Sequence, residues 1–241
     1  MSRVFLYLLF FSLLISNPLF SSEELNNDNQ KSQNITLNSD SFDLDGKTGI
    51  FKHCGNATLT QLGLSIVANC LTGKKLKDGN YEFIVAQGNP AQLTQTSQVK
   101  NETLNVSANI IEYIIPNQQF NIIENAALKI VSDKRDSIEI TANKIQLDNK
   151  SPENRDITAT GKPLRIELLE LGKTDLKAEA KKLHFNTQNS DLELSDDVVA
   201  HLELGQISAG IFKYNSKTKI SSFKKSDDQQ VEIIQKKKEQ K

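Results

Sequence analysis

The chain has 241 residues, of which 37% are hydrophobic and 24% are charged, and its formal net charge at pH 7 is −1. This length is enough for one or two domains, each with a hydrophobic core. A protein that binds the phosphate backbone of nucleic acids needs a clear excess of Lys and Arg, so the balanced charge argues against that class. The choice between an enzyme and a binding protein stays open.

The first 22 residues have the pattern of a secretory signal peptide. A positive charge at Arg3 precedes an apolar run that an Asn-Pro pair interrupts, and Ser21 and Ser22 offer small side chains to a signal peptidase. The run is shorter than the roughly 20 residues that span a bilayer comfortably. We therefore expect residues 1–22 to be cleaved. An uncleaved N-terminal anchor formed by residues 4–20 is the alternative.

Export would place the two cysteines, Cys54 and Cys70, in an oxidising compartment. Their spacing is not that of a C-x-x-C redox motif, and no histidines accompany them at the spacing of a zinc site. We expect a structural disulfide, which would close a loop and stabilise the fold by roughly 3 kcal/mol. Two unpaired buried thiols are the alternative.

A polar leader precedes the first expected strands. Residues 23–33 are rich in Asn, Gln and acidic side chains with almost no apolar residue, which predicts a flexible segment. From Ile35 onward, apolar and polar residues alternate with a period of two, as in strands that bury one face. Outside the N-terminal segment, a helical pattern is found only at residues 168–182, where Gly172 interrupts it. The sequence therefore predicts an all-β protein.

The alternating pattern occurs in about three copies. The same order of apolar positions recurs in each, for example at Phe51, Phe120 and Leu192. A repeat of about 70 residues, with several strands in each copy, predicts stacked layers of antiparallel strands. We expect the repeat region to span residues 34–223 and a short last strand and polar tail to occupy residues 224–241. The copies lie near residues 39–95, 106–168 and 178–223.

No catalytic, nucleotide-binding or metal-binding motif occurs in the chain, so we expect no enzymatic activity, no cofactor and no metal. His184 and His201 flank inward positions and should face solvent, whereas His53 occupies an apolar position of the repeat. Because no nucleophile or ligand set accompanies it, we interpret His53 as a packed or groove-lining side chain. A glycosidase with two paired carboxylates on a β-solenoid is the enzymatic alternative, since residues distant in sequence can form such a pair.

Several short motifs follow one another in a recognisable order. They are Ile35-x-Leu37-x-Ser39-Asp40, Phe51-x-x-Cys54-Gly55-Asn56-Ala57, Ile66-Val67-Ala68, Gly88-Asn89-Pro90-Ala91, Ile207-Ser-Ala-Gly-Ile-Phe-Lys-Tyr and Lys219-Ile-Ser-Ser-Phe. With these motifs the chain resembles the LptA/OstA family of periplasmic lipopolysaccharide transport proteins of Gram-negative bacteria. Three features depart from the family pattern: an additional central module at Val106 to Asp148, the cysteine pair, and His53 in place of an aromatic or aliphatic residue.

The resemblance implies a twisted β-jellyroll, open along one side, that holds the acyl chains of lipid A in an apolar groove in the periplasm. It also implies three kinds of partner, namely an LptC-like inner-membrane protein, an LptD-like outer-membrane protein, and copies of the same chain joined head to tail through edge strands. Burial of acyl chains is favourable by about 0.8 kcal/mol per CH₂ group and needs no chemical step.

The alternation predicts which side chains face inward, and under the resemblance these side chains line the lipid groove. They are Ile35, Leu37, Phe42, Leu44, Phe51, Leu59, Ile66, Leu93, Ile111, Tyr113, Phe120, Ile122, Ile140, Ile166, Leu183, Phe185, Leu192 and Leu194. A filled core is the alternative for such a set. Small residues beside large ones favour an open slot, and they are Ala57, Ala68, Ala126, Ala142 and Ala209.

Two other functions are alternatives to a groove-bearing bridge protein. One is an LptC-like component of the same bridge that keeps residues 4–20 as a membrane anchor. The other is a surface or adhesive β-repeat protein that binds no lipid. Fractionation of membranes and co-purification of lipid distinguish these alternatives from each other.

Overall fold

The computed structural model describes residues 36–61, 63–77, 80–97, 101–132, 136–151, 154–202, 205–226 and 229–235. The expected signal peptide, the leader at residues 23–33 and Ile35 lie outside these residues. Within the described ranges, no helix is both long enough and apolar enough to cross a membrane.

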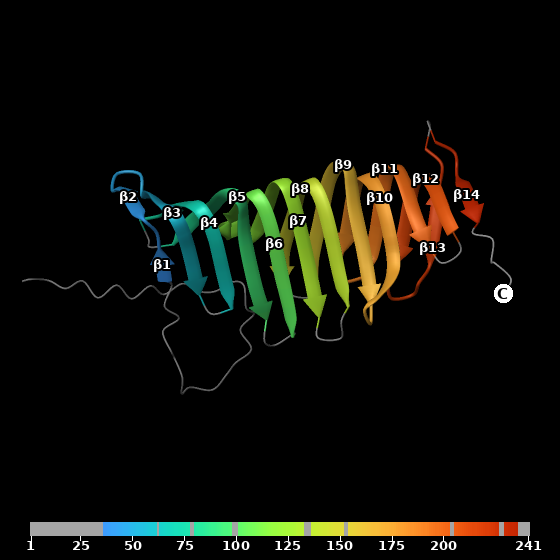
Figure 1. The fold of residues 1–241 in the computed structure, drawn as a ribbon, viewed down its shortest axis with the longest axis horizontal. Coiled ribbons are helices and arrows are strands. Elements are labelled where there is room, and N and C mark those ends of the chain that lie inside the picture. The colour runs from blue at the N-terminus through green and yellow to red at the C-terminus, as the bar shows by residue number, and fades with distance from the viewer. Residues whose placement is uncertain are drawn as a thin grey trace, which may run out of the picture.

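The described residues form one antiparallel sheet of 14 strands. From β3 to β13 each strand pairs with the next along the chain, while β1 and β2 both pair with β3, and β14 pairs with β12. The strands, labelled in Figure 1, are β1 (Thr36–Asn38), β2 (Ser41–Asp45), β3 (Ile50–Gln61), β4 (Leu64–Lys75), β5 (Tyr81–Ser97), β6 (Glu102–Ile114), β7 (Gln119–Ser132), β8 (Ser137–Ser151), β9 (Asn154–Glu170), β10 (Lys173–Asn186), β11 (Asp191–Leu202), β12 (Gly205–Asn215), β13 (Ser221–Lys224) and β14 (Glu232–Gln235). A short 3-10 turn, η1 (Ile115–Asn117), precedes β7.

Each long strand bends near its middle, so that its two halves lie in two facing layers (Figure 1). In every neighbouring pair from β3–β4 to β11–β12 the register is interrupted at this point. Wall A contains β2, β13 and one half of each strand between them, and wall B contains β1, β14 and the other halves. We call the line of bends the crease. The opposite margin, where the hairpin turns of the two walls lie, is the rim.

The bends use residues that accept unusual backbone conformations. In β3, β7 and β11 the bend contains Asn56 (φ 48°), Asn125 (φ 54°) and Asp197 (φ 56°). A positive φ is uncommon outside glycine, but Asn and Asp adopt it more readily than other residues. The bends of β5 and β9 contain the cis peptide bonds before Pro90 and Pro163. The same type of bend thus recurs every fourth strand, at positions that are aligned between the copies in the sequence.

The expected fold class, an all-β, twisted and open jellyroll with about three repeated sets of antiparallel strands, is confirmed. The sheet is not closed into a barrel, because β1 and β2 lie at one end and β13 and β14 at the other (Figure 1). Residues 168–182, which carry the interrupted helical pattern, form a β-hairpin in which Gly172 has a φ of 77° between β9 and β10.

Candidate functional site

The space between the walls is apolar along the sheet. One continuous cluster of buried hydrophobic residues extends from Ala57 in β3 to Tyr214 in β12. Alanines are register partners in adjacent strands of wall B next to the crease, for example Ala57 beside Ala68 and Ala126 beside Ala142. Larger side chains follow toward the rim. Because protein interiors are close-packed, only small side chains fit where the two walls converge. The small residues that favoured a slot in the sequence therefore mark the crease.

Most side chains assigned to the inner face are buried between the walls. Leu37 and Tyr113 are partly buried and pack against the same cluster. Burial raises the pKa of Tyr113 to about 12, and its ring stacks on Phe120 with 4.3 Å between the ring centroids. The exposed fraction is 8% or less for Phe51, Leu59, Ile66, Leu93, Ile111, Phe120, Ile122, Ile140, Ile166, Leu183, Phe185, Leu192 and Leu194.

Phe42 and Leu44, which were also assigned to the inward face, are 55% and 60% exposed. Both belong to β2, the outermost strand of wall A at the N-terminal end. Their register partners in β3 are His53 and Phe51, which places them on the inner face of the wall. The facing strand β1 has only 3 residues and leaves them uncovered. The apolar interior therefore reaches solvent at this end.

The C-terminal end has a similar uncovered position. Ile233 of β14 lies opposite Ile207, yet Ile233 is 58% exposed while Ile207 is 7% exposed. On the other wall, Phe223 of β13 stacks on Phe212 with 4.6 Å between the ring centroids. The apolar interior thus extends to both ends of the sheet.

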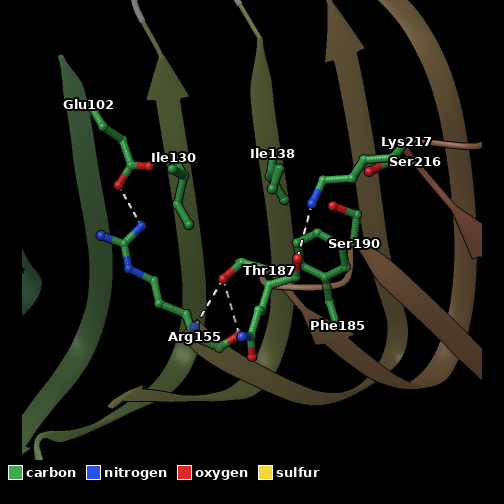
Figure 2. A pocket seen from close by; sticks show the side chains of 10 residues that line it. Glu102, Ile130, Ile138, Arg155, Phe185, Thr187, Ser190, Ser216 and Lys217 are labelled. Atoms are coloured by element: carbon green, nitrogen blue, oxygen red, sulfur yellow. Dashed lines mark hydrogen bonds and ion pairs between the residues drawn. The ribbon is translucent and has the colours of Figure 1, made fainter. Parts of the chain in front are cut away.

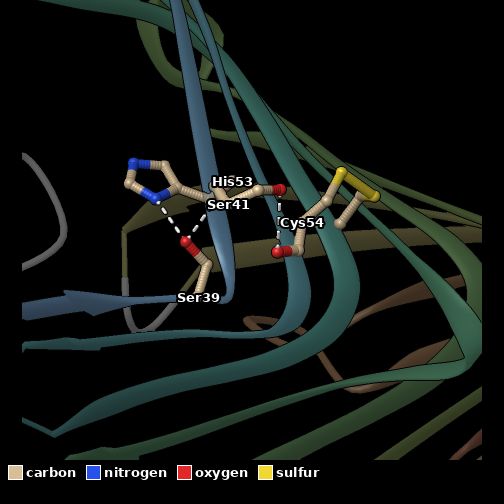
Figure 3. The surroundings of a disulfide bond; sticks show 5 residues. Ser39, Ser41, His53 and Cys54 are labelled. Carbon is tan, nitrogen blue, oxygen red and sulfur yellow. Dashed lines mark hydrogen bonds between the residues drawn. A yellow bond between two sulfur atoms is a disulfide. The ribbon is translucent and has the colours of Figure 1, made fainter.

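His53 is packed at the N-terminal end of the sheet. Its Nδ1 lies 3.0 Å from Ser39 Oγ (Figure 3), and its ring centroid lies 4.5 Å from that of Phe42. Burial lowers the pKa of His53. No group of three or more His, Cys, Asp or Glu side chains that could hold a metal ion occurs within the described residues.

A disulfide joins Cys54 and Cys70 beside the crease (Figure 3). The two cysteines are direct register partners in β3 and β4, with 4.2 Å between their Cα atoms. The bend of β3 follows Cys54 directly, so the cross-link lies where the first two long strands pass from wall A to wall B.

A cleft of about 460 Å³ opens between the two walls at the rim (Figure 2). Its apolar part consists of Ile130 and Ile138 from wall B and Phe185 from wall A. Its polar part consists of Glu102, Arg155, Thr187, Gln188, Ser190, Ser216 and Lys217. The cleft therefore combines apolar side chains of the interior with charged and hydroxyl groups of the rim.

An ion pair between Arg155 and Glu102 bridges the walls inside this cleft (Figure 2). The side chain of Arg155 is 8% exposed and that of Glu102 is 20% exposed. Arg155 Nε also donates to Asn149 Oδ1 at 3.2 Å, and the Arg155 backbone N–H donates to Thr187 Oγ1 at 2.9 Å. Removing one partner of a buried ion pair costs about 3–5 kcal/mol, because the other charge is left unpaired. This pair is therefore a tight connection between the two walls at the rim.

A second polar bridge joins the walls nearer the C-terminal end. Tyr214 OH of wall A donates to Asp175 Oδ2 of wall B at 2.5 Å. Lys219 Nζ lies 2.9 Å from Asp175 Oδ2 and 2.8 Å from Glu170 Oε2. Burial and the Asp175 hydrogen bond raise the pKa of Tyr214 to about 12. Partial burial acts to lower the pKa of Lys219, but its bonds to Glu170 and Asp175 outweigh this effect and raise it.

These rim residues were not identified from the sequence. Glu102 and Arg155 are 53 positions apart, and Asp175 and Tyr214 are 39 apart. The alternating pattern marks charged residues only as facing outward, so it gives no signal for a charge that bridges two walls. Of the residues assigned to the groove, Phe185 is the one that lines the rim cleft.

A family model described as the LptA/(LptD N-terminal domain) LPS transport protein matches the chain twice, at residues 36–138 and 130–220. The lipopolysaccharide export system protein LptH of Pseudomonas aeruginosa is 27% identical over 112 residues, which are 46% of this chain and 64% of LptH. The aligned part thus spans less than two thirds of that relative.

A solved structure is also similar to the chain. It is the crystal structure of LptH, the LptA homologous periplasmic component of the conserved lipopolysaccharide transport device from Pseudomonas aeruginosa. The comparison has a TM-score of 0.46 and 22% sequence identity, and it covers 57% of this chain and 94% of that chain.

Proposed function

The chain belongs to the LptA/LptD N-terminal domain family of LPS transport proteins, and we propose that it carries lipopolysaccharide across the periplasm with the acyl chains of lipid A held between its two walls. This is a family of transport proteins rather than of enzymes. The proposed location follows from the relative LptH, which is described as a periplasmic component.

The observation that carries the proposal is the continuous apolar interior, which reaches solvent at both ends of the sheet. One end presents Phe42 and Leu44, and the other presents Ile233. Each CH₂ group transferred from water to such an interior contributes about 0.8 kcal/mol. Sugars and phosphates of the same molecule would stay in water along the rim. Because the interior side chains are close-packed, loading requires the walls to separate at the rim, where side chains rather than the chain itself join them.

The edge strands provide the proposed means of assembly. At the N-terminal end, β2 is the outermost strand of wall A and β1 that of wall B. At the C-terminal end, the outermost strands are β13 in wall A and β14 in wall B. Edge strands with unpaired backbone groups can add a strand from another protein. We propose an LptC-like inner-membrane partner at the N-terminal end and an LptD-like outer-membrane partner at the C-terminal end. Further copies of the chain could extend the bridge head to tail.

The length of the sheet is consistent with a long carrier. The family model matches twice along one uninterrupted sheet. At a spacing of about 4.8 Å between strands, each four-strand repeat adds roughly 19 Å to the path along the interior. We propose that the module from Val106 to Asp148 lengthens the path that one subunit provides.

Lipid that stays bound to the purified mature protein tests the proposal directly. Mass spectrometry should find lipopolysaccharide or lipid A in the native protein and not in protein refolded from denaturant without lipid. Absence of any co-purifying lipid, together with failure to bind added lipid A, would favour a β-repeat protein that binds no lipid.

Site-specific photo-crosslinking locates the bound lipid. A crosslinker at Tyr113, which packs against the interior, should capture lipopolysaccharide, whereas one at Glu112 on the outer face should not. Glu112 is a matched control, because it is the adjacent residue of β6 and pairs with Asn121 on the neighbouring strand. Equal labelling at both positions would reject the interior as the lipid site. Carbonate washing of membranes separates a soluble carrier from an anchored LptC-like component.

A further inference from the structure

We propose that the rim cleft at Arg155 recognises a phosphate on the head group of the bound amphiphile, and that the phosphate displaces Glu102 from Arg155. This inference rests on the proposed function, since it assigns the head group of the same ligand to a place on the rim.

The composition of the cleft matches a phosphorylated amphiphile. Its apolar lining is formed by Ile130, Ile138 and Phe185, which belong to the core cluster or pack against it. Its charged lining is formed by two cationic side chains, Arg155 and Lys217, and one carboxylate, Glu102. Hydroxyl groups of three further residues surround these charges, at Thr187, Ser190 and Ser216. A ligand with acyl chains and an adjacent phosphate would satisfy both parts at once.

Besides Glu102, Asn149 orients the guanidinium of Arg155, because Asn149 Oδ1 accepts from Arg155 Nε. The backbone N–H of Arg155 donates to Thr187 Oγ1, which fixes the main chain at this residue. Arginine presents several donors in a planar fork that suits two oxygens of one phosphate. A phosphate of charge near −2 attracts this cation more strongly than the single negative charge of Glu102 does. Lys217, which donates to the Gln188 carbonyl at 3.0 Å, would add a second cation.

Replacement of Glu102 by a phosphate as the partner of Arg155 would link recognition of the head group to entry of the acyl chains. Glu102 belongs to wall B and Arg155 to wall A, so their ion pair is one of the connections that hold the rim together in the unloaded protein. When a phosphate takes the place of Glu102, this connection between the walls is lost. The rim can then widen and admit the acyl chains of the molecule whose head group has been recognised.

The test compares equilibrium binding of lipid A with binding of the same lipid after enzymatic removal of its phosphates. The measured quantity is the preference, that is, the ratio of the two affinities. Arg155→Gln should reduce the preference roughly 10-fold, the factor expected for loss of one charge-assisted contact. Glu102→Gln should increase the preference, because the competing carboxylate is gone while Arg155 is retained. Inorganic phosphate alone should not bind measurably, since it lacks the acyl chains.

Arg165→Gln is the matched control. Arg165 also pairs with a carboxylate, that of Glu179, but on the exposed outer face, where its side chain is 60% exposed. The preference of this variant should equal that of the wild type. If Arg155→Gln does not fold, the double variant Arg155→Gln/Glu102→Gln leaves no unpaired charge and should show the same loss of preference.

Two results would overturn the inference. One is a preference that Arg155→Gln leaves unchanged, with both lipids weakened by the same factor, which would make the ion pair a structural connection only. The other is a lower preference in Glu102→Gln. Neither result affects the proposed function, which fails only if the wild-type protein binds neither form of the lipid.

Discussion

Along the crease, the walls are joined by the covalent chain itself, and small side chains occupy the adjacent positions. Ala126 and Ala142 are neighbours of this kind in β7 and β8, and the bend residue Asn125 has a φ of 54°. Along the rim, large side chains meet a cleft, and the walls are joined by pairs such as Arg155 with Glu102. One margin is therefore a fixed fold line, whereas the other is held by polar contacts between side chains. Under the proposed function, this difference would allow the rim to open around a bound lipid while the crease stays closed.

The largest expected effect comes from removing a large side chain near the rim. Phe185→Ala should lower the free energy of unfolding by about 3–5 kcal/mol, because the buried ring is lost and a cavity remains. Phe185 is 3% exposed. The control is His184→Ala, one residue away on the exposed outer face, which should change stability by no more than about 0.5 kcal/mol. Urea unfolding measures both, and equal effects would contradict the assignment of the two faces.

The disulfide is expected to contribute the next largest effect, at the crease. The cysteines are separated by 16 positions, and closing a loop of this size stabilises a fold by about 3 kcal/mol in the chain-entropy model. The double variant Cys54→Ala/Cys70→Ala should therefore unfold at lower urea concentration than the oxidised wild type. Reductant should have no effect on this variant. Labelling of both thiols in native, unreduced protein would show that the bond is not present.

The narrow space at the crease can be tested by enlarging one alanine. Ala126→Leu should destabilise the protein by about 1–3 kcal/mol, since Ala126 is 1% exposed next to the crease and lies beside Ala142 of the neighbouring strand. Ala127→Leu, at the next residue on the outer face, should change stability by no more than about 0.5 kcal/mol. If Ala126→Leu were tolerated or increased the stability, the walls would not converge tightly at the crease.

The smallest effect concerns His53 at the uncovered N-terminal end. Burial lowers the pKa of His53 below its usual value of about 6.5. The neutral form is thus favoured in the folded state, and the stabilisation it gives is present above pH of about 6.5 and is lost as the pH falls through the folded-state pKa. Unfolding measurements between about pH 7 and pH 5 should show a smaller loss of stability in His53→Gln than in the wild type. An NMR titration that places the pKa above the usual value would contradict the burial argument.

The sequence by itself determined the local features of this fold. Period-two alternation needs only the geometry of a strand, in which successive side chains point to opposite faces, and it identified buried positions such as Ile122 and Ile166. The bends were not predicted, although Gly55, Asn56, Asn125 and Asp197 are residue types that accept positive φ more readily than others. The family resemblance rested on these same local motifs, and the matching family model shows that the chain belongs to this family.

Only the tertiary structure decided which positions are covered and which charges meet. Phe42 and Leu44 have the correct alternation, yet they are exposed, because coverage depends on the length of the strand in the opposite wall. Arg155 and Glu102 come from strands that the fold brings together across the rim, and no short-range pattern records a contact over 53 positions. The physical reason is the same in both cases. Side-chain direction is set by the local backbone, whereas burial and pairing depend on what the other wall places opposite.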